Sequence, residues 1–190
     1  HNLPLETFQA YLDARIFDLY NDPMPDMGSF EGYLGETRAA LYQMIAFVAG
    51  LTRSSELADA CGHTGMAIGL AQLIRQTGKH RAKHQLFFPE TILQEAGLEA
   101  DAWFADQINA RHLRVLEEIS QIAQSHYQQA LGAIKQLPIE SRAVFLPLTL
   151  VPKLLQKLRK SPESCLTQPL TLSRLTVHWT YLRSDKQFSR

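Results

Sequence analysis

The chain has 190 residues, equal numbers of basic and acidic side chains (19 each) and 45% hydrophobic residues. This length suits one domain with one core, spanning residues 1–190. With zero net charge the sequence lacks the basic excess of a nucleic-acid-binding protein, so we expect no nucleic-acid partner. The two cysteines are too few for a disulfide framework and indicate reduced thiols in an intracellular compartment. No apolar run approaches the roughly 20 residues that span a bilayer, so we expect at most peripheral membrane association.

Helical periodicity dominates the sequence, and strand signals are almost absent. The first predicted helix places Phe8, Leu12, Ile16 and Leu19 on one face, and the proline-containing segment at residues 21–25 ends it. In chain order, the predicted helices cover residues 5–19, 29–50, 54–78, 91–96, 101–137, 140–160 and 171–183. We therefore expect an all-α helical bundle, a fold that places its sites between facing helices.

The third predicted helix, at residues 54–78, is rich in glycine and alanine. Glycine destabilises a helix, so several glycines in one helix favour either the close approach of a second helix or room for a ligand beside the backbone. We expect this helix to end near Gly78, and a loop to cover residues 79–89.

Helix-breaking residues are frequent in the C-terminal part of the chain. A helix is expected to bend at Pro147 and Pro152, and residues 161–169 are expected to form a linker. The last predicted helix has an apolar face that includes Trp179. We expect this face to pack onto the bundle. Contact with a membrane surface, with Trp179 and Tyr181 near the interface, is the alternative.

Pairs of histidines and aspartates have simple interpretations. His80 and His84 stand four residues apart, as zinc ligands on a helix do, but we expect them in a loop with no third ligand. His126 is expected to fill the stripe of a long helix rather than to take part in catalysis. Asp18 and Asp22 are interpreted as residues of the turn that ends the first helix, not as a metal-binding pair.

The most informative pattern consists of three stretches: Gly-His-Thr-Gly at 62–65, Gly-Leu-Ala-Gln-Leu-Ile-Arg at 69–75 and Gln-Leu-Phe-Phe-Pro at 85–89. It resembles the second signature of the squalene/phytoene synthase family. There a Gly/Ala-rich helix leads to a Leu-Arg pair, an Asp-rich turn and a Gly-Arg-x-Tyr-Leu-Pro segment. Residues 18–25 with Tyr33 are similar to another family segment. The resemblance implies an isoprenoid-synthase bundle around a deep apolar cavity, with the helices of the family's first Asp-rich motif expected before residue 1.

The chain departs from this family where the resemblance implies metal binding. If Arg75 is the motif arginine, the two motif aspartates fall at positions 76 and 80, which carry Gln76 and His80. Gln72 stands where an asparagine is expected. Magnesium prefers anionic oxygen ligands, which none of these side chains supplies. We therefore predict no cofactor and assign no catalytic residue; Mg²⁺ would be needed only by an active enzyme.

Basic side chains replace the lost carboxylates. Arginine and lysine bind phosphate directly, so one interpretation is a metal-free site for a diphosphate or a phospholipid head group. The other is a solvated basic helix end, which needs no ligand because cations interact favourably with the C-terminal end of the helix dipole. The candidate ligand-binding residues are Tyr33, Gln72, Arg75, Gln76, Lys79, His80 and Arg81.

The resemblance and its departures imply a catalytically degenerate member of the family. One branch serves as an assembly factor for respiratory complex I in mitochondria, and a similar protein would bind a protein partner or an isoprenoid or lipid ligand. It would lie in the cytoplasm or, in a eukaryote, in the mitochondrial matrix or at the periphery of the inner membrane. The alternative is an active prenyl transferase that condenses isoprenyl diphosphates in squalene or phytoene biosynthesis. A helical lipid-binding protein is a third possibility.

Overall fold

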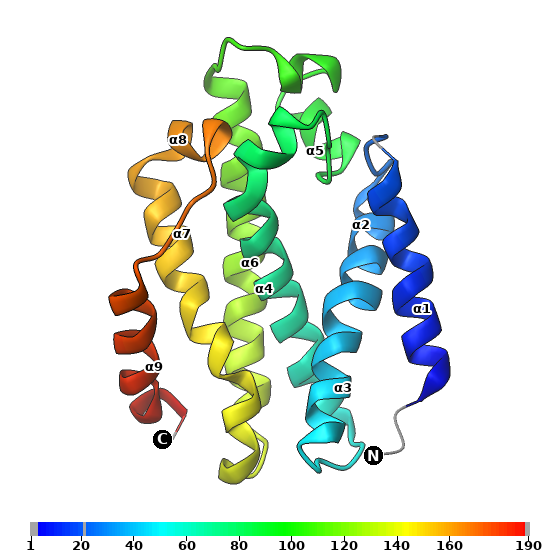
Figure 1. The fold of residues 1–190 in the computed structure, drawn as a ribbon, viewed down its shortest axis with the longest axis vertical. Helices are drawn as coiled ribbons and strands as arrows, with labels where there is room; N and C mark the ends of the chain where they lie inside the picture. The colour runs from blue at the N-terminus through cyan, green and yellow to red at the C-terminus, as the bar shows by residue number, and fades with distance from the viewer. Residues whose placement is uncertain (1–3, 21, 189–190) are drawn as a thin grey trace.

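A computed structural model describes residues 4–20 and 22–188, with side chains up to residue 184. Within this part every regular element is helical, which confirms the all-α prediction (Figure 1). The α-helices are α1 (Leu5–Arg15), α2 (Met27–Leu34), α3 (Ala40–Val48), α4 (Ser55–Ala82), α5 (Glu90–Glu95), α6 (Ala110–Lys135), α7 (Val151–Lys160), α8 (Pro162–Thr167) and α9 (Arg174–Phe188). Between them lie the 3₁₀ helices η1 (Ile16–Leu19), η3 (Asp101–Phe104) and η4 (Ile139–Leu150), and the π-helix η2 (Gly35–Ala39).

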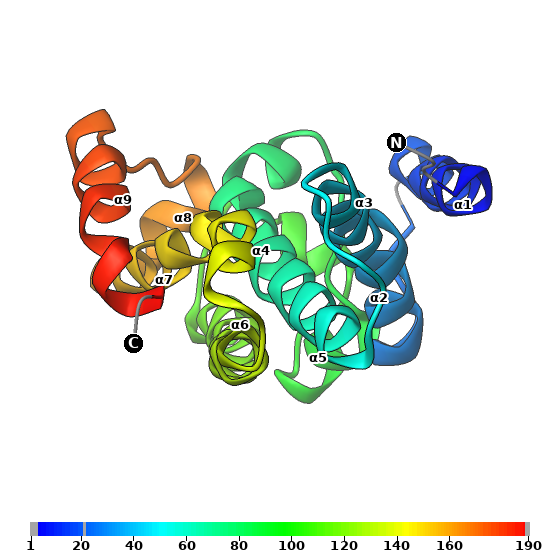
Figure 2. The same ribbon diagram turned by 90° about the horizontal axis from the view of Figure 1, so that it is seen from below.

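The long helices α4 and α6 form the centre of the bundle, with α2 and α3 on one side and α7 on the other (Figure 2). Both begin at a side-chain cap. The Ser54 hydroxyl accepts a hydrogen bond from the Leu57 amide at 3.1 Å, and the Asn109 side chain accepts one from the Arg111 amide at 3.0 Å. Such caps satisfy amide groups that lack a partner inside the helix, so they fix where α4 and α6 start.

The glycines of α4 allow other segments to approach its backbone closely. A Cβ atom on Gly65 would collide with the backbone of Ala39 in η2. A Cβ atom on Gly78 would collide with the backbone of Gln168, just after α8. Close approach, one of the two interpretations of the glycine-rich helix, is thus confirmed at both positions.

The predicted end of α4 at Gly78 is wrong. The helix continues to Ala82, and the following loop is correspondingly shorter than the predicted 79–89. Gly78 is buried against the segment after α8, and this tertiary packing supports the helix beyond a residue that weakens it in isolation.

Three further boundaries differ from the prediction. The helix predicted from residue 101 starts at Ala110, because Asn109 caps it and residues 101–104 form the separate η3 turn. The predicted 161–169 linker contains α8. Where a bend was expected, the chain changes from the 3₁₀ helix η4, which contains Pro147, to the α-helix α7, which has Pro152 in its first turn. Asn21, in the segment predicted to end the first helix, lies outside the described residues.

The two cysteines are buried and free. The Cys165 thiol donates a hydrogen bond to the Ile74 carbonyl at 2.8 Å and so joins α8 to α4. Burial raises the pKa of both the Cys61 and the Cys165 thiol to about 12. Both side chains are therefore neutral packing groups at pH 7.

The helices α1 and α9 lie at opposite edges of the bundle and expose apolar side chains (Figures 1 and 2). On α9, Leu175 is 83% exposed, Trp179 56% and Leu182 75%. The expectation that this face packs onto the bundle is therefore wrong; α9 contacts η4 through its opposite face instead. No helix in the described part of the chain is both long and apolar enough to cross a bilayer.

Candidate functional site

A cavity of about 280 Å³ opens between the C-terminal half of α4, the end of η1 and the π-helix η2. Six of the seven sequence-predicted site residues line it, and Arg81 does not. The lining residues are Arg15, Asp18, Tyr33, Arg38, Gln72, Leu73, Arg75, Gln76, Lys79, His80, Lys83, Gln85 and Phe87. The structure thus brings most of the predicted residues together in one place.

The continuation of α4 past Gly78 places the predicted residues on one face. Gln72, Arg75, Gln76, Lys79 and His80 follow one another at the three- and four-residue spacing of a single helix face. The predicted loop would have left Lys79 and His80 without a fixed direction, whereas the helix aligns them with Arg75.

Arg81 faces the opposite way and bonds to main-chain carbonyls. Its guanidinium donates to the carbonyl oxygens of Trp103 at 2.8 Å, Leu166 at 2.7 Å and Ala105 at 2.7 Å. These bonds tie the end of α4 to η3 and α8. The structure therefore gives Arg81 a structural position rather than the ligand-binding position predicted from its place in the basic run.

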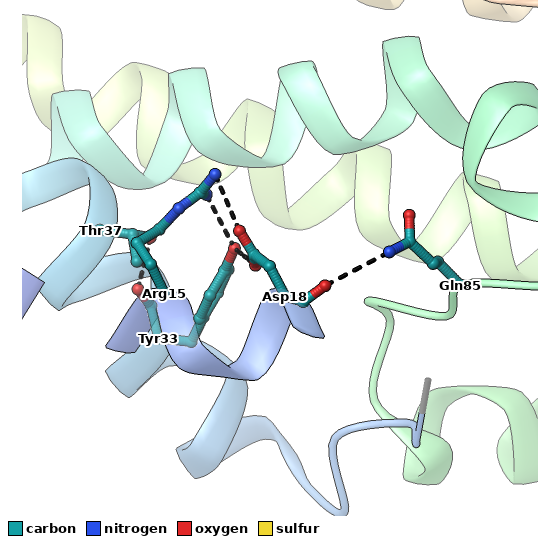
Figure 3. A network of polar contacts seen from close by, with 5 residues as sticks. All are labelled: Arg15, Asp18, Tyr33, Thr37 and Gln85. Carbon is teal, nitrogen blue, oxygen red and sulfur yellow. Dashed lines mark hydrogen bonds and ion pairs between the residues drawn. The ribbon is translucent and has the colours of Figure 1, made fainter. Parts of the chain in front are cut away.

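One wall of the cavity is a network of Arg15, Asp18 and Tyr33 (Figure 3). The Tyr33 hydroxyl donates to Asp18 Oδ1 at 2.7 Å, and Arg15 Nη2 forms an ion pair with Asp18 Oδ2 at 2.8 Å. Arg15 Nη1 also donates to the Tyr33 oxygen at 3.2 Å. Burial, and then the hydrogen bond to Asp18, raises the pKa of Tyr33, so its hydroxyl keeps its proton at pH 7. Both carboxylate oxygens of Asp18 are engaged.

Arg38 and Arg75 contribute buried nitrogen atoms with no hydrogen-bond partner among the described residues. In each case the unpaired atom is Nε of the guanidinium. Arg38 belongs to η2 and lies across Gly69, where an added Cβ would come within 2.9 Å of Arg38 Cγ. A buried donor without a partner costs about 1–3 kcal/mol, and both guanidinium groups belong to residues that line the cavity.

The cavity is strongly cationic at neutral pH. Arg15, Arg38, Arg75, Lys79 and Lys83 line it, and Asp18 is the only carboxylate among the described lining residues. This charge distribution attracts a multivalent anion such as a phosphate or diphosphate.

His80 does not add to that charge at pH 7. Burial, and then the nearby Lys79 ammonium, lowers the pKa of His80 to about 4. The neutral ring lies 4.7 Å from the ring of Phe87, centroid to centroid. His80 was predicted as one of a run of basic groups, but its burial makes it a neutral donor or acceptor instead.

The donor set does not fit a magnesium ion. Gln72, Gln76 and His80 offer neutral atoms, and the Asp18 carboxylate is already shared by Arg15 and Tyr33. Among the described residues, no three or more His, Cys, Asp and Glu side chains form a group that could hold a metal ion.

A second cavity, also of about 280 Å³, adjoins the cationic cavity at Gln72 and Arg75. Its other lining residues are mostly apolar: Ile68, Ala71, Pro147, Leu150, Val151, Leu154, Leu172, Val177 and Tyr181. An anion site beside an apolar cavity suits a ligand with a charged head and a hydrocarbon chain.

Sequence reasoning missed the residues that the fold brings to the site from other helices. Arg15 and Arg38 gave no local signal, and Asp18 was interpreted as a turn residue. The tertiary contacts of α1, η1 and η2 with α4 place all three, and one sequence does not reveal such contacts.

The fold and the site thus define a class of protein: all-α bundles that hold a cationic cavity beside an apolar one. Residues 1–178 match the family model described as squalene/phytoene synthase, and the chain belongs to that family. The resemblance found in the sequence is confirmed.

Individual relatives are distant. The chain is 23% identical over 165 residues to a complex I assembly factor 6 homolog of Dictyostelium discoideum, covering 86% of this chain and 46% of that protein. It is 24% identical over 141 residues to a phytoene synthase of Rhodobacter capsulatus, covering 74% and 41%. The chain thus spans less than half the length of these relatives. A squalene synthase structure from Alicyclobacillus acidocaldarius superposes with a TM-score of 0.77 at 16% identity, covering 89% of this chain and 63% of that one.

Proposed function

We propose that this chain is a catalytically degenerate squalene/phytoene synthase homologue that binds a phosphate-bearing isoprenoid or lipid without a metal ion. The observation that carries the proposal is the pair of buried, unpartnered Nε atoms of Arg38 and Arg75 beside a cationic cavity. A diphosphate or phosphate would accept hydrogen bonds from these donors and neutralise part of the positive charge.

The adjoining apolar cavity supports an amphiphilic ligand over a free anion. Gln72 and Arg75 belong to both cavities, so a head group held at Arg75 would have its hydrocarbon chain beside Ala71 and Leu154. Burial of the chain adds affinity of about 25 cal/mol per Å² of apolar surface removed from water.

The second half of the proposal concerns what the protein does once its ligand is bound. Relatives in Dictyostelium discoideum and Mus musculus carry the name complex I assembly factor 6. We propose that this chain likewise acts through a protein partner in the assembly of respiratory complex I, at the periphery of the membrane that houses it. The bound amphiphile would then serve as a structural or regulatory ligand rather than as a substrate.

Calorimetric titration in EDTA tests the binding proposal. Farnesyl diphosphate is expected to bind, inorganic pyrophosphate to bind more weakly and farnesol to bind weakly or not at all, because the head group and chain occupy adjoining cavities. Equal affinity for pyrophosphate and farnesyl diphosphate would remove the apolar cavity from the proposal. If farnesol bound as tightly as farnesyl diphosphate, the cationic cavity would not contribute to affinity, and the anion site would be withdrawn from the proposal.

Turnover of farnesyl or geranylgeranyl diphosphate with magnesium tests catalytic degeneracy. We expect none from the unmodified protein. A Gln76→Asp/His80→Asp variant tests whether the two missing carboxylates alone restore it. Turnover by the unmodified protein that is lost on Arg75→Ala would overturn the proposal and establish the alternative, an active prenyl transferase.

A further inference from the structure

The outer face of α9 combines large apolar side chains with cations. Its exposed residues, here called the α9 outer face, are Arg174, Leu175, His178, Trp179, Leu182 and Arg183. They recur at the spacing of a single helix face, and the Arg183 guanidinium lies 4.5 Å from the centroid of the Trp179 ring. No acidic side chain is among these six residues.

We infer that the α9 outer face docks the protein onto an anionic lipid bilayer. Leucine and tryptophan side chains of a surface helix enter the boundary between head groups and acyl chains, and tryptophan favours that depth. Arginines flanking the apolar stripe attract anionic head groups. Residues 171–190 contain four basic residues and one acidic residue, so the charge of the whole C-terminal segment favours the same partner.

The opposite edge of the bundle shows why the inference is confined to α9. There α1 also exposes an apolar stripe, including Leu5 at 68% and Leu12 at 51%. Its exposed charged neighbours are Glu6 and Asp13, and residues 1–22 contain four acidic residues and one basic residue. An anionic surface would repel that edge. Of the two exposed apolar stripes, only the one on α9 therefore has the charge complementary to such a bilayer.

The inner face of α9 borders the apolar cavity, through Val177 and Tyr181. Docking of the outer face would bring that cavity next to the lipid chains of the bilayer, from which an amphiphile could enter. Docking through α9 deepens the proposed location at the periphery of a membrane. It does not depend on ligand binding, because the α9 outer face contains none of the residues that line the cationic cavity.

Tryptophan fluorescence provides the direct test. The chain has two tryptophans, and Trp103 is only 1% exposed, so a change on vesicle binding reports Trp179. With vesicles of phosphatidylcholine containing about one third phosphatidylglycerol, we expect a blue shift and quenching by brominated lipid chains. With phosphatidylcholine alone we expect at least about 10-fold weaker partitioning. Equal binding to both vesicles, or to neither, would overturn the inference.

Paired variants identify the face. Arg174→Gln/Arg183→Gln is expected to weaken partitioning about 25-fold, since each basic residue near an anionic surface contributes about 5-fold. Leu175→Gln/Leu182→Gln is expected to weaken it at least about 10-fold. The matched control, Leu5→Gln/Leu12→Gln on α1, should partition like the unmodified protein. All these side chains are exposed, so circular dichroism and thermal unfolding should stay unchanged.

Two results distinguish this inference from other outcomes. If the α9 variants bind vesicles normally, or the α1 control loses binding equally, the α9 outer face is not the docking site. If sedimentation without vesicles shows dimers that the α9 variants abolish, the face is an interface between copies and the inference fails. Arg75→Gln should dock normally whether or not it binds farnesyl diphosphate, so failure of docking and failure of the proposed function are separable.

Discussion

Two arginines of α4 that stand only six residues apart differ in their hydrogen bonding: one lies at the cationic cavity and the other at the C-terminal end of the helix. Arg75 keeps a buried Nε without a partner beside the cavity, whereas the Arg81 guanidinium donates to three main-chain carbonyls. In the first arrangement the guanidinium lines the cavity and Nε bonds to no described group, whereas in the second the donors hold the fold together. Membership of a basic run therefore does not identify a binding residue; the direction of the side chain does.

The largest expected effect comes from removing the structural arginine. Arg81→Gln should lower the free energy of unfolding by about 3 kcal/mol, because three carbonyl oxygens lose a charged donor. Urea unfolding measures this loss. The affinity of the folded variant for farnesyl diphosphate should stay within about 3-fold of the unmodified protein. A large loss of affinity with normal stability would reverse the assignments of Arg81 and Arg75.

The next largest effect is expected at the contact between Gly65 of α4 and η2, the π-helix that carries Arg38. Gly65→Ala should destabilise the protein by about 2 kcal/mol, because its Cβ collides with the backbone of η2. Gly62→Ala is the matched control on the same helix: its Cβ has nothing within 4 Å, and it should stabilise α4 by about 0.5–1 kcal/mol. Thermal unfolding compares the two. Equal effects would mean that η2 does not approach α4 as described.

Removal of a cavity arginine should affect binding rather than stability. Arg75→Gln and Arg38→Gln are each expected to weaken farnesyl diphosphate binding about 10- to 30-fold, the loss of a charged hydrogen bond. Stability should not fall, because each Nε has no partner to lose and its removal relieves the cost of burying an unpaired donor. Arg159→Gln, on the exposed side of α7, is the control for general charge effects. If it weakens binding as much, the affinity comes from net charge and not from the cavity.

The smallest expected effect is a pH dependence centred on His80. Its pKa is lowered to about 4 in the folded protein, so the unfolded chain binds a proton below pH 6.5 that the folded protein does not. Stability should therefore fall as the pH drops from 6.5 towards 4 and level off below that. Because the ring is partly exposed, we expect a contribution of about 1 kcal/mol.

Urea midpoints at pH 7 and pH 5 for the unmodified protein and His80→Gln isolate this contribution. The variant should lose less stability at pH 5. Some loss should remain, since burial also lowers the pKa of His112 and His126. An identical loss in both proteins would show that His80 is not buried beside Lys79.

The sequence was sufficient for the fold class because periodicity and the family pattern agree along most of the chain. For the α4 side of the cavity, the family pattern and the basic run indicated Gln72 to His80, but not the single helix that carries them past Gly78. The prediction failed at Gly78, whose helix is supported by the neighbouring α8 segment rather than by its own propensity. Arg81 was included because it belongs to the basic run, and its bonds to three main-chain carbonyls depend on tertiary packing.

Residues that reach the site from elsewhere could not be predicted. Arg15 and Arg38 have unremarkable local contexts, and their proximity to Arg75 follows from packing of α1 and η2 on α4. The outward direction of Trp179 was equally hidden, because an amphipathic pattern shows that a helix has an apolar face but not what that face contacts.

The central claim is that anion binding here needs no metal ion. Calorimetric titration of farnesyl diphosphate into the unmodified protein, in EDTA and again in excess magnesium, tests it most directly. We predict binding in EDTA, with an affinity that magnesium leaves unchanged or weakens by competing for the diphosphate. Binding that appears only when magnesium is present would contradict the account, because it would require metal ligands that Gln76 and His80 do not supply.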